Sequence, residues 1–421
     1  MADRLGVGLV GSGFMANFHV RSWTSVRHGD IMGIANPDVQ SAEAMAKTVR
    51  QLKVGEPQVY ADVREMVMDP KIDALWICTP NYTRVEIMEQ IAEVIKDGKG
   101  TLKGIAVEKP LARTVGEAKR MLEIVEELGI LHGYLENQVF APSVVRGKHI
   151  IWARGAKVTG RPYLARCAEE HGGPHEPWFW SGKQQGGGVL NDMMCHSVEA
   201  ARFLLSDPEQ PKDALRPVSV NAEIATLKWS RPEYIELLKE MTHGKIDYGK
   251  TPAEDFARAN INFQDEKGNL LVAEVTTSWS FVGPGLRLSF ELMGPEYYMQ
   301  SNSLEPDLNV FLSRNVKGEE GEDLVEKQFA EQGLMPVLPN EELVYGYIDE
   351  DKYMVDCFLE GKMPKETLHD GLLVVQMLMS AYKSSEEGKK LAFDTDSLDD
   401  FVPKVAQGTY TAQDPVKSAH K

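Results

Sequence analysis

The first 135 residues alternate short apolar runs with amphipathic segments, which predicts strands and helices in turn. The runs expected as strands are 5–10, 31–35, 72–78, 105–107 and 131–135, and the expected helices are 14–26, 41–52, 85–96 and 114–128. Thr114 and Glu117 form a capping box at the start of the last helix. Short connections between alternating strands and helices favour a doubly wound parallel sheet, α/β in class, over residues 1–137.

From residue 138 onward, strand-like runs dominate the pattern. They cover 163–168, 218–229, 257–263, 270–281 and 286–292, with hairpin-like connections at 265–268 and 282–285. Such runs predict a mostly antiparallel sheet, interrupted by a helix at 189–205. We therefore expect a second, α+β domain over 138–400, with a C-terminal helix at about 370–387 and an extended tail at 401–421. Residues 231–251 look like an inserted helix and loop, with the role of a lid, an interface or mere decoration left open.

Composition narrows the function classes. A chain of 421 residues with 43% apolar residues suits two or three globular domains. The formal charge of −17 disfavours binding to nucleic acid or to anionic membranes. Four scattered cysteines without a CxxC pair predict reduced thiols. With no signal peptide and no apolar run of 18 residues, we expect a cytoplasmic protein.

The strongest chemical motif follows the first predicted strand. It reads Gly11-Ser12-Gly13-Phe14-Met15-Ala16 and opens a predicted helix. In such a turn the first glycine allows a tight bend and the second lets backbone approach a pyrophosphate, which the helix N-terminus then attracts. The motif predicts a dinucleotide site, and the alternative is a glycine turn without a ligand.

The end of the second strand should contact the adenosine ribose. Asn36 stands there instead of the usual Asp or Glu, followed by Pro37 and Asp38. An amide can bind a 2′-hydroxyl, and no arginine follows at once to bind a 2′-phosphate. We therefore expect NAD as cofactor, with NADP possible.

Two further motifs carry acid–base chemistry. Glu108-Lys109-Pro110 ends a strand, at the edge of an α/β sheet where ligands bind, and its X-Pro bond is a candidate for the cis form. Asp192 and His196 are four residues apart on a predicted helix that follows Gly186-Gly187-Gly188, so they share one face. A carboxylate beside an imidazole suits proton transfer. The alternatives are a solvent-exposed lysine and a surface ion pair.

A third stretch, 169–180, is rich in histidine and tryptophan. Aromatic faces beside polar groups suit a sugar ring, so we expect a substrate loop that includes His175, Trp178 and Trp180. The alternative is a packed aromatic loop. The histidines here complete no convincing ligand set, so we expect no metal site.

Taken together, these segments resemble the Gfo/Idh/MocA oxidoreductase family, the glucose–fructose oxidoreductase and inositol dehydrogenase group. The segments that carry the resemblance are GLVGSGFMANFH at 8–19, ICTPN at 77–81, VEKPLARTVGEAKRML at 107–122, GGGVLNDMMCHSVEAARFLL at 186–205 and DGLLVVQMLMSAYKSSEEGKKLAF at 370–393. The resemblance implies a Rossmann domain and an open-faced, mostly antiparallel sheet domain.

The resemblance also implies residue roles. His196 would be the acid/base, Lys109 would polarise the substrate oxygen, and Asp192 would orient substrate. Gly11, Ser12, Gly13, Phe14, Met15, Asn36, Thr79, Pro80, Asn81, Glu108 and Lys109 would line the cofactor groove, and Asn137, His175, Trp178 and Trp180 would lie near substrate. Two positions depart from the family pattern: Arg84 stands where histidine is frequent, and Glu136-Asn137-Gln138 replaces a frequent Arg-Arg pair.

The expected activity is NAD(P)-dependent oxidation of a secondary hydroxyl of a sugar, cyclitol or glycoside. Two alternatives stay open: a glycosidase that oxidises its substrate only transiently with bound NAD, and a non-catalytic sugar or dinucleotide sensor. Since an open sheet face needs covering, we also expect a homo-oligomer, a dimer or a tetramer.

Overall fold

The computed structural model describes residues 4–313, 316, 324–328 and 332–412. The chain forms two compact units, each built from separate stretches of sequence. Unit 1 comprises the chain up to Pro142 together with Tyr345–Val375, and unit 2 comprises Ser143–Val344 together with the chain from Gln376. The expectation of a continuous second domain over 138–400 is therefore corrected, because residues 345–375 return to the first unit.

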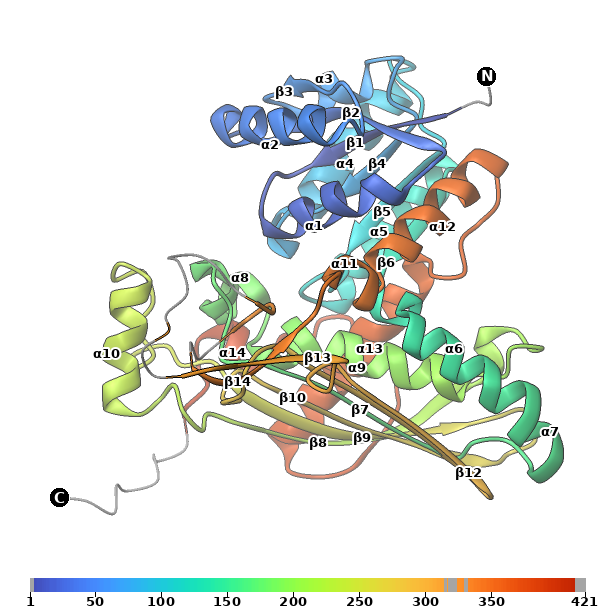
Figure 1. The fold of residues 1–421 in the computed structure, drawn as a ribbon, viewed down its shortest axis with the longest axis vertical. Coiled ribbons are helices and arrows are strands. Elements are labelled where there is room, and N and C mark those ends of the chain that lie inside the picture. The colour runs from blue at the N-terminus through green and yellow to red at the C-terminus, as the bar shows by residue number, and fades with distance from the viewer. Residues whose placement is uncertain (1–3, 314–315, 317–323, 329–331, 413–421) are drawn as a thin grey trace. The chain divides into compact units, whose positions relative to one another are not determined.

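Unit 1 contains a six-stranded parallel sheet in the order β3-β2-β1-β4-β5-β6 (Figure 1). Its strands are β1 (Leu5–Val10), β2 (Gly29–Ala35), β3 (Gln58–Tyr60), β4 (Ala74–Ile77), β5 (Gly104–Glu108) and β6 (Leu131–Leu135). Its helices are α1 (Phe14–Ser22), α2 (Val39–Leu52), α3 (Val63–Val67), α4 (Arg84–Lys96), α5 (Val115–Leu128) and α12 (Tyr347–Glu360). This strand order is that of a dinucleotide-binding Rossmann sheet, so the predicted fold class of the first domain is confirmed.

The core of unit 1 explains why residues 345–375 belong to it. All side chains of β1 and β4 are buried, as expected for a parallel sheet covered on both faces. Helix α12 packs close to this sheet because glycines leave room for its side chains. A Cβ atom at Gly104 would come within 2.8 Å of the Phe358 ring, and one at Gly133 within 2.7 Å of the Met354 sulfur.

Unit 2 is built on a seven-stranded mixed sheet in the order β12-β11-β7-β10-β9-β8-β15. Its strands are β7 (Leu164–Glu170), β8 (Arg216–Ala225), β9 (Phe256–Gln264), β10 (Leu270–Ser278), β11 (Arg287–Gly294), β12 (Tyr297–Asn302) and β15 (Leu391–Ala392). A short two-stranded sheet joins β13 (Leu308–Leu312) and β14 (Gly333–Val337). The mostly antiparallel second domain is thus confirmed, with β7 and β10 as a parallel pair.

One of the two predicted hairpins is wrong. The connection at 265–268 joins the antiparallel neighbours β9 and β10, as expected. The connection at 282–285 does not close a hairpin, since β7 lies between β10 and β11 and pairs with both. Both strands have apolar runs on either side of a glycine-rich link, and such a pattern does not reveal a third strand that inserts between them.

The helices of unit 2 are dominated by α9 (Val189–Leu205), which packs on β7 and β10. On the other face of the sheet, charged side chains form exposed ion pairs across strands, such as Arg166 with Glu274. The other α-helices among the described residues are α6 (Pro142–Ile150), α7 (Ala156–Thr159), α8 (Gly182–Gln185), α10 (Pro232–Met241), α11 (Glu341–Val344), α13 (Leu368–Glu387) and α14 (Lys404–Gln407). Helix α13 confirms the predicted C-terminal helix. In the predicted extended tail, 401–421, the short helix α14 is the one helix among the described residues 401–412, and 413–421 lie outside the described residues.

The structure bears on the predictions about membrane spans and cysteines. Within the described ranges, no helix has both the length and the apolar character that crossing a bilayer requires. The same part of the chain contains no disulfide, and Cys167 and Cys195 are buried.

Candidate active site

The glycine turn between β1 and α1 has the geometry that the motif predicts. Gly11 has a φ of 102°, and a Cβ there would lie 3.1 Å from the Cys78 carbonyl oxygen. A Cβ at Gly13 would meet nothing within 4 Å, so the turn is open at that point. Gly13 is the N-cap of α1, and no side chain among the described residues caps this helix. The N–H groups at the start of a helix attract a pyrophosphate, and the open turn at Gly13 leaves room for one, so these residues fit a dinucleotide.

Asn36 lies beside this turn. Its Nδ2 donates to Ser12 Oγ at 2.5 Å, and its Oδ1 accepts the Asp38 N–H at 2.9 Å. Ser12 Oγ is also 2.7 Å from Ser41 Oγ. The predicted ribose-binding position is thus neutral and ordered by neighbours, and exposed Asp38 adds negative charge next to it. A 2′-phosphate would be repelled there, which favours NAD.

Residues 79–81 follow β4 at the carboxyl edge of the same sheet. Asn81 is buried, and the Thr79 hydroxyl makes no hydrogen bond to any described residue although it is buried. Thr79 and Pro80 are partly exposed. Their position next to the end of β1 agrees with the predicted cofactor groove, because ligands of such sheets bind at the carboxyl ends of the strands.

The Glu108–Lys109 corner ends β5, the next strand along. The Lys109–Pro110 peptide bond is cis, as the sequence suggested. Glu108 is buried, and its Oε2 accepts the Lys109 N–H at 2.9 Å. The backbone of Lys109 is therefore held directly by the preceding side chain.

Sequence reasoning missed the groups that surround this corner. Buried Arg84, noted only as a departure from the family pattern, donates from Nε to the Thr79 carbonyl oxygen at 2.9 Å and from its other nitrogens to carbonyl oxygens of 108–111. His19 and Asp351 adjoin Glu108 from α1 and α12. Asp351 is 332 residues from His19, and a pattern of apolar positions carries no signal for such a contact.

Asp192 and His196 lie in the first two turns of α9, and both are buried. Their i,i+4 spacing places them on one face, as predicted. His196 Nε2 is 3.8 Å from Glu169 Oε2 on β7, so a buried carboxylate adjoins the predicted acid/base. The alternative of an exposed surface pair is thereby excluded.

The glycines before α9 make room for protein, not for a ligand. A Cβ at Gly187 would lie 1.9 Å from the Tyr382 hydroxyl oxygen, and one at Gly188 2.3 Å from the Glu254 carbonyl oxygen. Glu254 Oε1 accepts the Gly188 and Leu190 N–H groups at 2.9 and 3.1 Å and the Tyr382 hydroxyl at 2.5 Å. A buried carboxyl group thus caps the helix that carries Asp192 and His196, and no local pattern in the sequence indicates this role of Glu254.

Of the three side chains predicted to contact substrate in the loop at 171–180, one is packed in the core and two are at least partly exposed, so neither a substrate loop nor a packed aromatic loop describes all of it. Trp180 is 1% exposed and packs against Trp229 and Trp279, with ring centroids 4.7 and 5.0 Å apart. Its side chain is therefore part of the core of unit 2, which corrects the expectation that it faces a substrate. His175 is exposed and Trp178 is partly exposed, so both stay candidates.

Asn137 has a structural role in unit 1. It is buried after β6, and its Nδ2 donates to the Tyr345 carbonyl oxygen at 2.7 Å. This contact of the amide nitrogen ties the chain after β6 to the returning segment, and the expected substrate contact of Asn137 stays a prediction.

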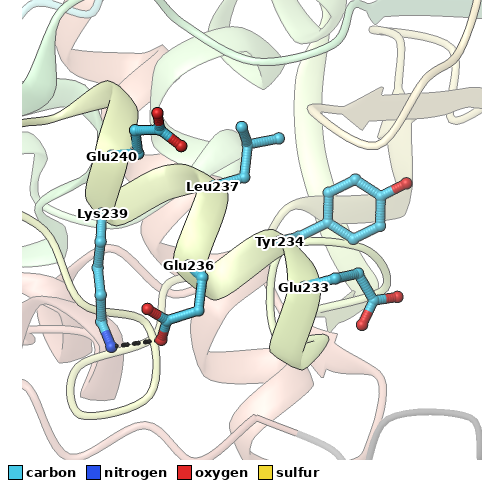
Figure 2. A pocket seen from close by; sticks show the side chains of 6 residues that line it. All are labelled: Glu233, Tyr234, Glu236, Leu237, Lys239 and Glu240. Carbon is cyan, nitrogen blue, oxygen red and sulfur yellow. Dashed lines mark hydrogen bonds and ion pairs between the residues drawn. The ribbon is translucent and has the colours of Figure 1, made fainter.

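A surface pocket lies on α10, in the insert at 231–251. All its lining residues come from this one helix, and Lys239 pairs with Glu236 at 2.8 Å (Figure 2). It contains none of the predicted site residues.

Comparisons with known proteins agree with this geometry. The model of the oxidoreductase family with an NAD-binding Rossmann fold, GFO_IDH_MocA, matches residues 5–134, and the GFO/IDH/MocA C-terminal domain matches residues 155–298. Levoglucosan dehydrogenase of Pseudarthrobacter phenanthrenivorans is 27% identical over 312 residues, which cover 70% of this chain and 72% of that protein. The NAD⁺-dependent scyllo-inositol 2-dehydrogenase of Bacillus subtilis is 28% identical over 207 residues, 49% of this chain and 55% of that protein.

Solved structures share the fold of nearly the whole chain. The crystal structure of GenD2 from gentamicin A biosynthesis, in complex with NAD, matches with a TM-score of 0.73 and 24% identity. It covers 94% of this chain and 97% of that chain. A levoglucosan dehydrogenase complex with NADH and levoglucosan matches with a TM-score of 0.68 and 22% identity over 93% of this chain and 100% of that chain.

Proposed function

The chain belongs to the GFO/IDH/MocA family of NAD-binding oxidoreductases, and from this premise we propose that it oxidises a secondary hydroxyl of a sugar, cyclitol or glycoside with NAD. The observation that carries the proposal is the open glycine turn at the uncapped start of α1, which fits a dinucleotide. The names of its relatives, dehydrogenases of levoglucosan and of inositol, support a polyhydroxylated ring as substrate.

The cofactor would be held along the carboxyl edge of the unit 1 sheet. The turn Gly11–Met15 would receive the pyrophosphate, Asn36 the adenosine ribose, and Thr79–Asn81 with Glu108 and Lys109 the remaining groove. When bound, NAD supplies the hydride acceptor at its nicotinamide. The neutral Asn36 and acidic Asp38 favour NAD over NADP.

The proton chemistry falls to three side chains. Lys109 would donate a hydrogen bond to the substrate oxygen and stabilise negative charge that develops on it. His196 would accept the hydroxyl proton, and the nearby Glu169 carboxylate would stabilise the imidazolium that results. Asp192 would bind a neighbouring hydroxyl of the substrate and orient the ring. Exposed His175 and Trp178 are the proposed substrate contacts in unit 2.

The first test is a turnover assay with NAD, and separately NADP, against a panel of sugars, cyclitols and glycosides. We expect NADH formation with one substrate class. Release of an aglycone without net NADH would favour the transient-oxidation glycosidase instead, and NAD binding without any turnover would favour a sensor. Native mass spectrometry measures the mass of the assembly, and we expect that of a dimer or a tetramer.

The residue assignments are tested by Lys109→Ala and His196→Asn. Each should lower kcat by about 100-fold or more because a general acid–base or charge-stabilising group is lost. NAD affinity, measured by calorimetry, should stay nearly unchanged for His196→Asn. Matched controls are Lys96→Ala, at an exposed ion pair with Glu127, and His149→Asn, at an exposed position. Wild-type turnover in either site variant would refute its assignment.

A further inference from the structure

A buried histidine lies between two carboxylates under the Lys109 corner of unit 1. His19 on α1 is fully buried. Its Nδ1 is 2.8 Å from Asp351 Oδ1 and 3.1 Å from Oδ2, and its Nε2 is 3.1 Å from Glu108 Oε1. Glu108 and Asp351 are also buried. The imidazole therefore bridges β5 and α12 through its two nitrogens.

Counting donors and acceptors favours one protonation state for this bridge, given that both carboxyl groups are ionised. Asp351 Oδ1 also accepts the Trp76 Nε1–H at 3.0 Å, and Glu108 Oε2 also accepts the Lys109 N–H at 2.9 Å. Both carboxylates thus act as acceptors for their other partners. A neutral imidazole has one N–H and one lone pair, and the lone pair would then face a carboxylate oxygen at hydrogen-bond distance. Only the imidazolium donates to both.

We propose that His19 is an imidazolium throughout the neutral pH range and that it is a positioning residue for Lys109, acting through the Glu108 carboxylate. Glu108 Oε1 faces His19 and Oε2 receives the Lys109 N–H, so the histidine and the lysine backbone are attached to the same carboxyl group. Buried charges persist in proteins when they are paired and hydrogen-bonded, as here.

The surrounding charges favour this state. Burial opposes the charge on His19, but the Asp351 carboxylate and the hydrogen bonds to Asp351 and Glu108 outweigh it and hold the pKa of His19 well above its ordinary value. Burial also acts to raise the pKa of Glu108, yet the His19 hydrogen bond and charge, with Lys109 and Arg84, leave it lowered.

Two other titratable groups face the imidazole. Burial raises the pKa of the Cys78 thiol to about 12, so this thiol is neutral at physiological pH. Burial also raises the pKa of Glu350 on α12 well above its ordinary value, which favours the neutral form of that carboxyl group. The charge of Glu136 also acts to raise the pKa of Glu350. The formal charges next to His19 are thus those of Glu108 and Asp351.

Arg84 holds the corner from the opposite side. Its guanidinium joins the Thr79 carbonyl oxygen to those of Glu108, Pro110 and Leu111, so it links the two strand ends of the proposed cofactor groove. Arg84 donates hydrogen bonds to the backbone carbonyl oxygens of this corner, and Glu108 accepts one from the Lys109 N–H. Side chains therefore bind both the carbonyl and the N–H groups of this backbone. Removing His19 would leave the Glu108 carboxylate buried with fewer partners, and the corner would shift to find new ones.

The charge state is tested directly by NMR of ¹⁵N-histidine-labelled full-length protein titrated from pH 6 to 9.5. We expect the His19 nitrogens to keep imidazolium shifts over this range. Two internal comparisons are His132, a buried histidine whose pKa burial lowers to about 4, and His28, which pairs with Asp356 at an exposed site. In Glu108→Gln, His19 should begin to titrate within the range because one carboxylate is gone. Neutral-imidazole shifts for His19 at pH 7 would overturn the proposal.

The positioning role rests on the proposed function and is tested by kinetics. His19→Gln should lower kcat by about 10- to 100-fold, since small misplacements of a catalytic group are costly. The double variant His19→Gln/Glu108→Gln should recover part of this loss, because the buried charge of Glu108, which the single variant leaves without its imidazole partner, is then removed as well. His28→Asn is the control and should keep wild-type kcat. A double variant no better than the single one, although folded, would overturn the positioning role.

Two outcomes separate this proposal from the proposed function. A wild-type protein with no dehydrogenase activity refutes the function, and the NMR titration still decides the charge of His19.

A metal ion is the alternative occupant of this cluster. The ligand atoms of His19, Glu350 and Asp351 lie within 4.8 Å of one another, a spacing that a metal ion could also occupy. One equivalent of zinc in the purified protein, found by mass spectrometry, would overturn the imidazolium assignment.

Discussion

At the scale of single residues, buried ionisable groups decide how unit 1 responds to pH. Glu350 on α12 is fully buried, and neither of its carboxyl oxygens has a hydrogen-bond partner among the described residues. It differs in this from its neighbour Asp351, which accepts bonds from His19 and Trp76. Two adjacent acidic residues of one helix therefore differ: Asp351 completes a charge pair with His19, and Glu350 is a buried carboxyl whose pKa burial raises well above its ordinary value.

This difference predicts a pH-dependent effect of Glu350→Gln. Burial raises the pKa of Glu350, so its contribution to stability is fully present below the unfolded value near 4.5 and is lost as pH rises. Glutamine cannot ionise and avoids this loss. The variant should therefore gain about 1–3 kcal/mol in free energy of unfolding at pH 8 relative to wild type, and much less at pH 4.5.

Urea denaturation at both pH values measures the effect of Glu350→Gln. The control is Glu360→Gln on the same helix, where the carboxylate is exposed and pairs with Lys362. Equal stability differences at the two pH values would show that Glu350 is ionised in the folded state.

At the scale of elements, the start of α9 is capped by two side chains that are distant in the sequence, Glu254 from the loop before β9 and Tyr382 from α13. Glu254 Oε1 accepts N–H groups of Gly188 and Leu190, and Tyr382 on α13 donates its hydroxyl to the same oxygen. A hydrogen-bond acceptor at a helix N-terminus is stabilising, and here the Glu254 carboxyl oxygen replaces the Ser, Thr or Asp side chain that usually caps a helix. The proposed catalytic side chains Asp192 and His196 are therefore oriented by a side chain 58 or more residues away in the sequence.

Tyr382→Phe tests this cap with a minimal change. The hydroxyl also accepts the Gly188 and Asn191 N–H groups, at 3.1 and 3.3 Å, so its loss removes three hydrogen bonds at the buried start of α9. We expect a loss of about 1–3 kcal/mol in free energy of unfolding, together with a lower kcat. Tyr298→Phe, at an exposed tyrosine, should change neither.

The same variant has a predictable pH dependence. Burial raises the pKa of Glu254 to about 7, and the Tyr382 hydrogen bond acts to lower it. Stability from the protonated Glu254 is present below pH 4.5 and is lost as pH rises toward 7. Without the hydroxyl the folded pKa should rise further, so thermal unfolding of Tyr382→Phe should keep a pH slope above 7 where wild type has levelled off. Parallel profiles would contradict the assignment.

The sequence predicts features whose residues are close together in the chain and misses those whose residues meet only in the fold. The glycine turn, the Lys-Pro corner and the Asp192–His196 spacing are local patterns, and all three were predictable. The residues that hold the last two of these features in place were not predictable. Arg84, Asp351 and Glu254 meet their partners only through the tertiary fold, and each is a charged residue that a pattern of apolar positions assigns to the surface. Trp180 was misjudged for the converse reason, since a tryptophan loop predicts a packed core and an aromatic ligand site equally well.

At the scale of the whole molecule, the chain leaves unit 1 at Pro142 and returns to it for Tyr345–Val375. This return supplies Asp351 to the His19 bridge, Tyr345 to the Asn137 amide, and the side chains that fill the space over three sheet glycines. Val355, Phe358 and Met354 stand where a Cβ at Gly29, Gly104 or Gly133 would be placed. A dinucleotide-binding domain cut from the sequence at its apparent boundary would lack all of these contacts.

Fragment 1–142 should therefore fail to fold on its own, whereas the same fragment joined to 345–375 by a flexible linker should fold and bind NAD. Without α12, buried glycine backbone and the His19 side chain would be exposed, and large apolar contacts of the core would be missing. Circular dichroism during thermal unfolding measures cooperativity, and calorimetry with NAD measures binding. A joined fragment in which Asp351 is replaced by Asn separates the contribution of the charge bridge from that of apolar packing. Cooperative unfolding and NAD binding by 1–142 alone would mean that the returning segment is an addition to a complete domain, and the two-segment unit would then be a feature of geometry without consequence for folding.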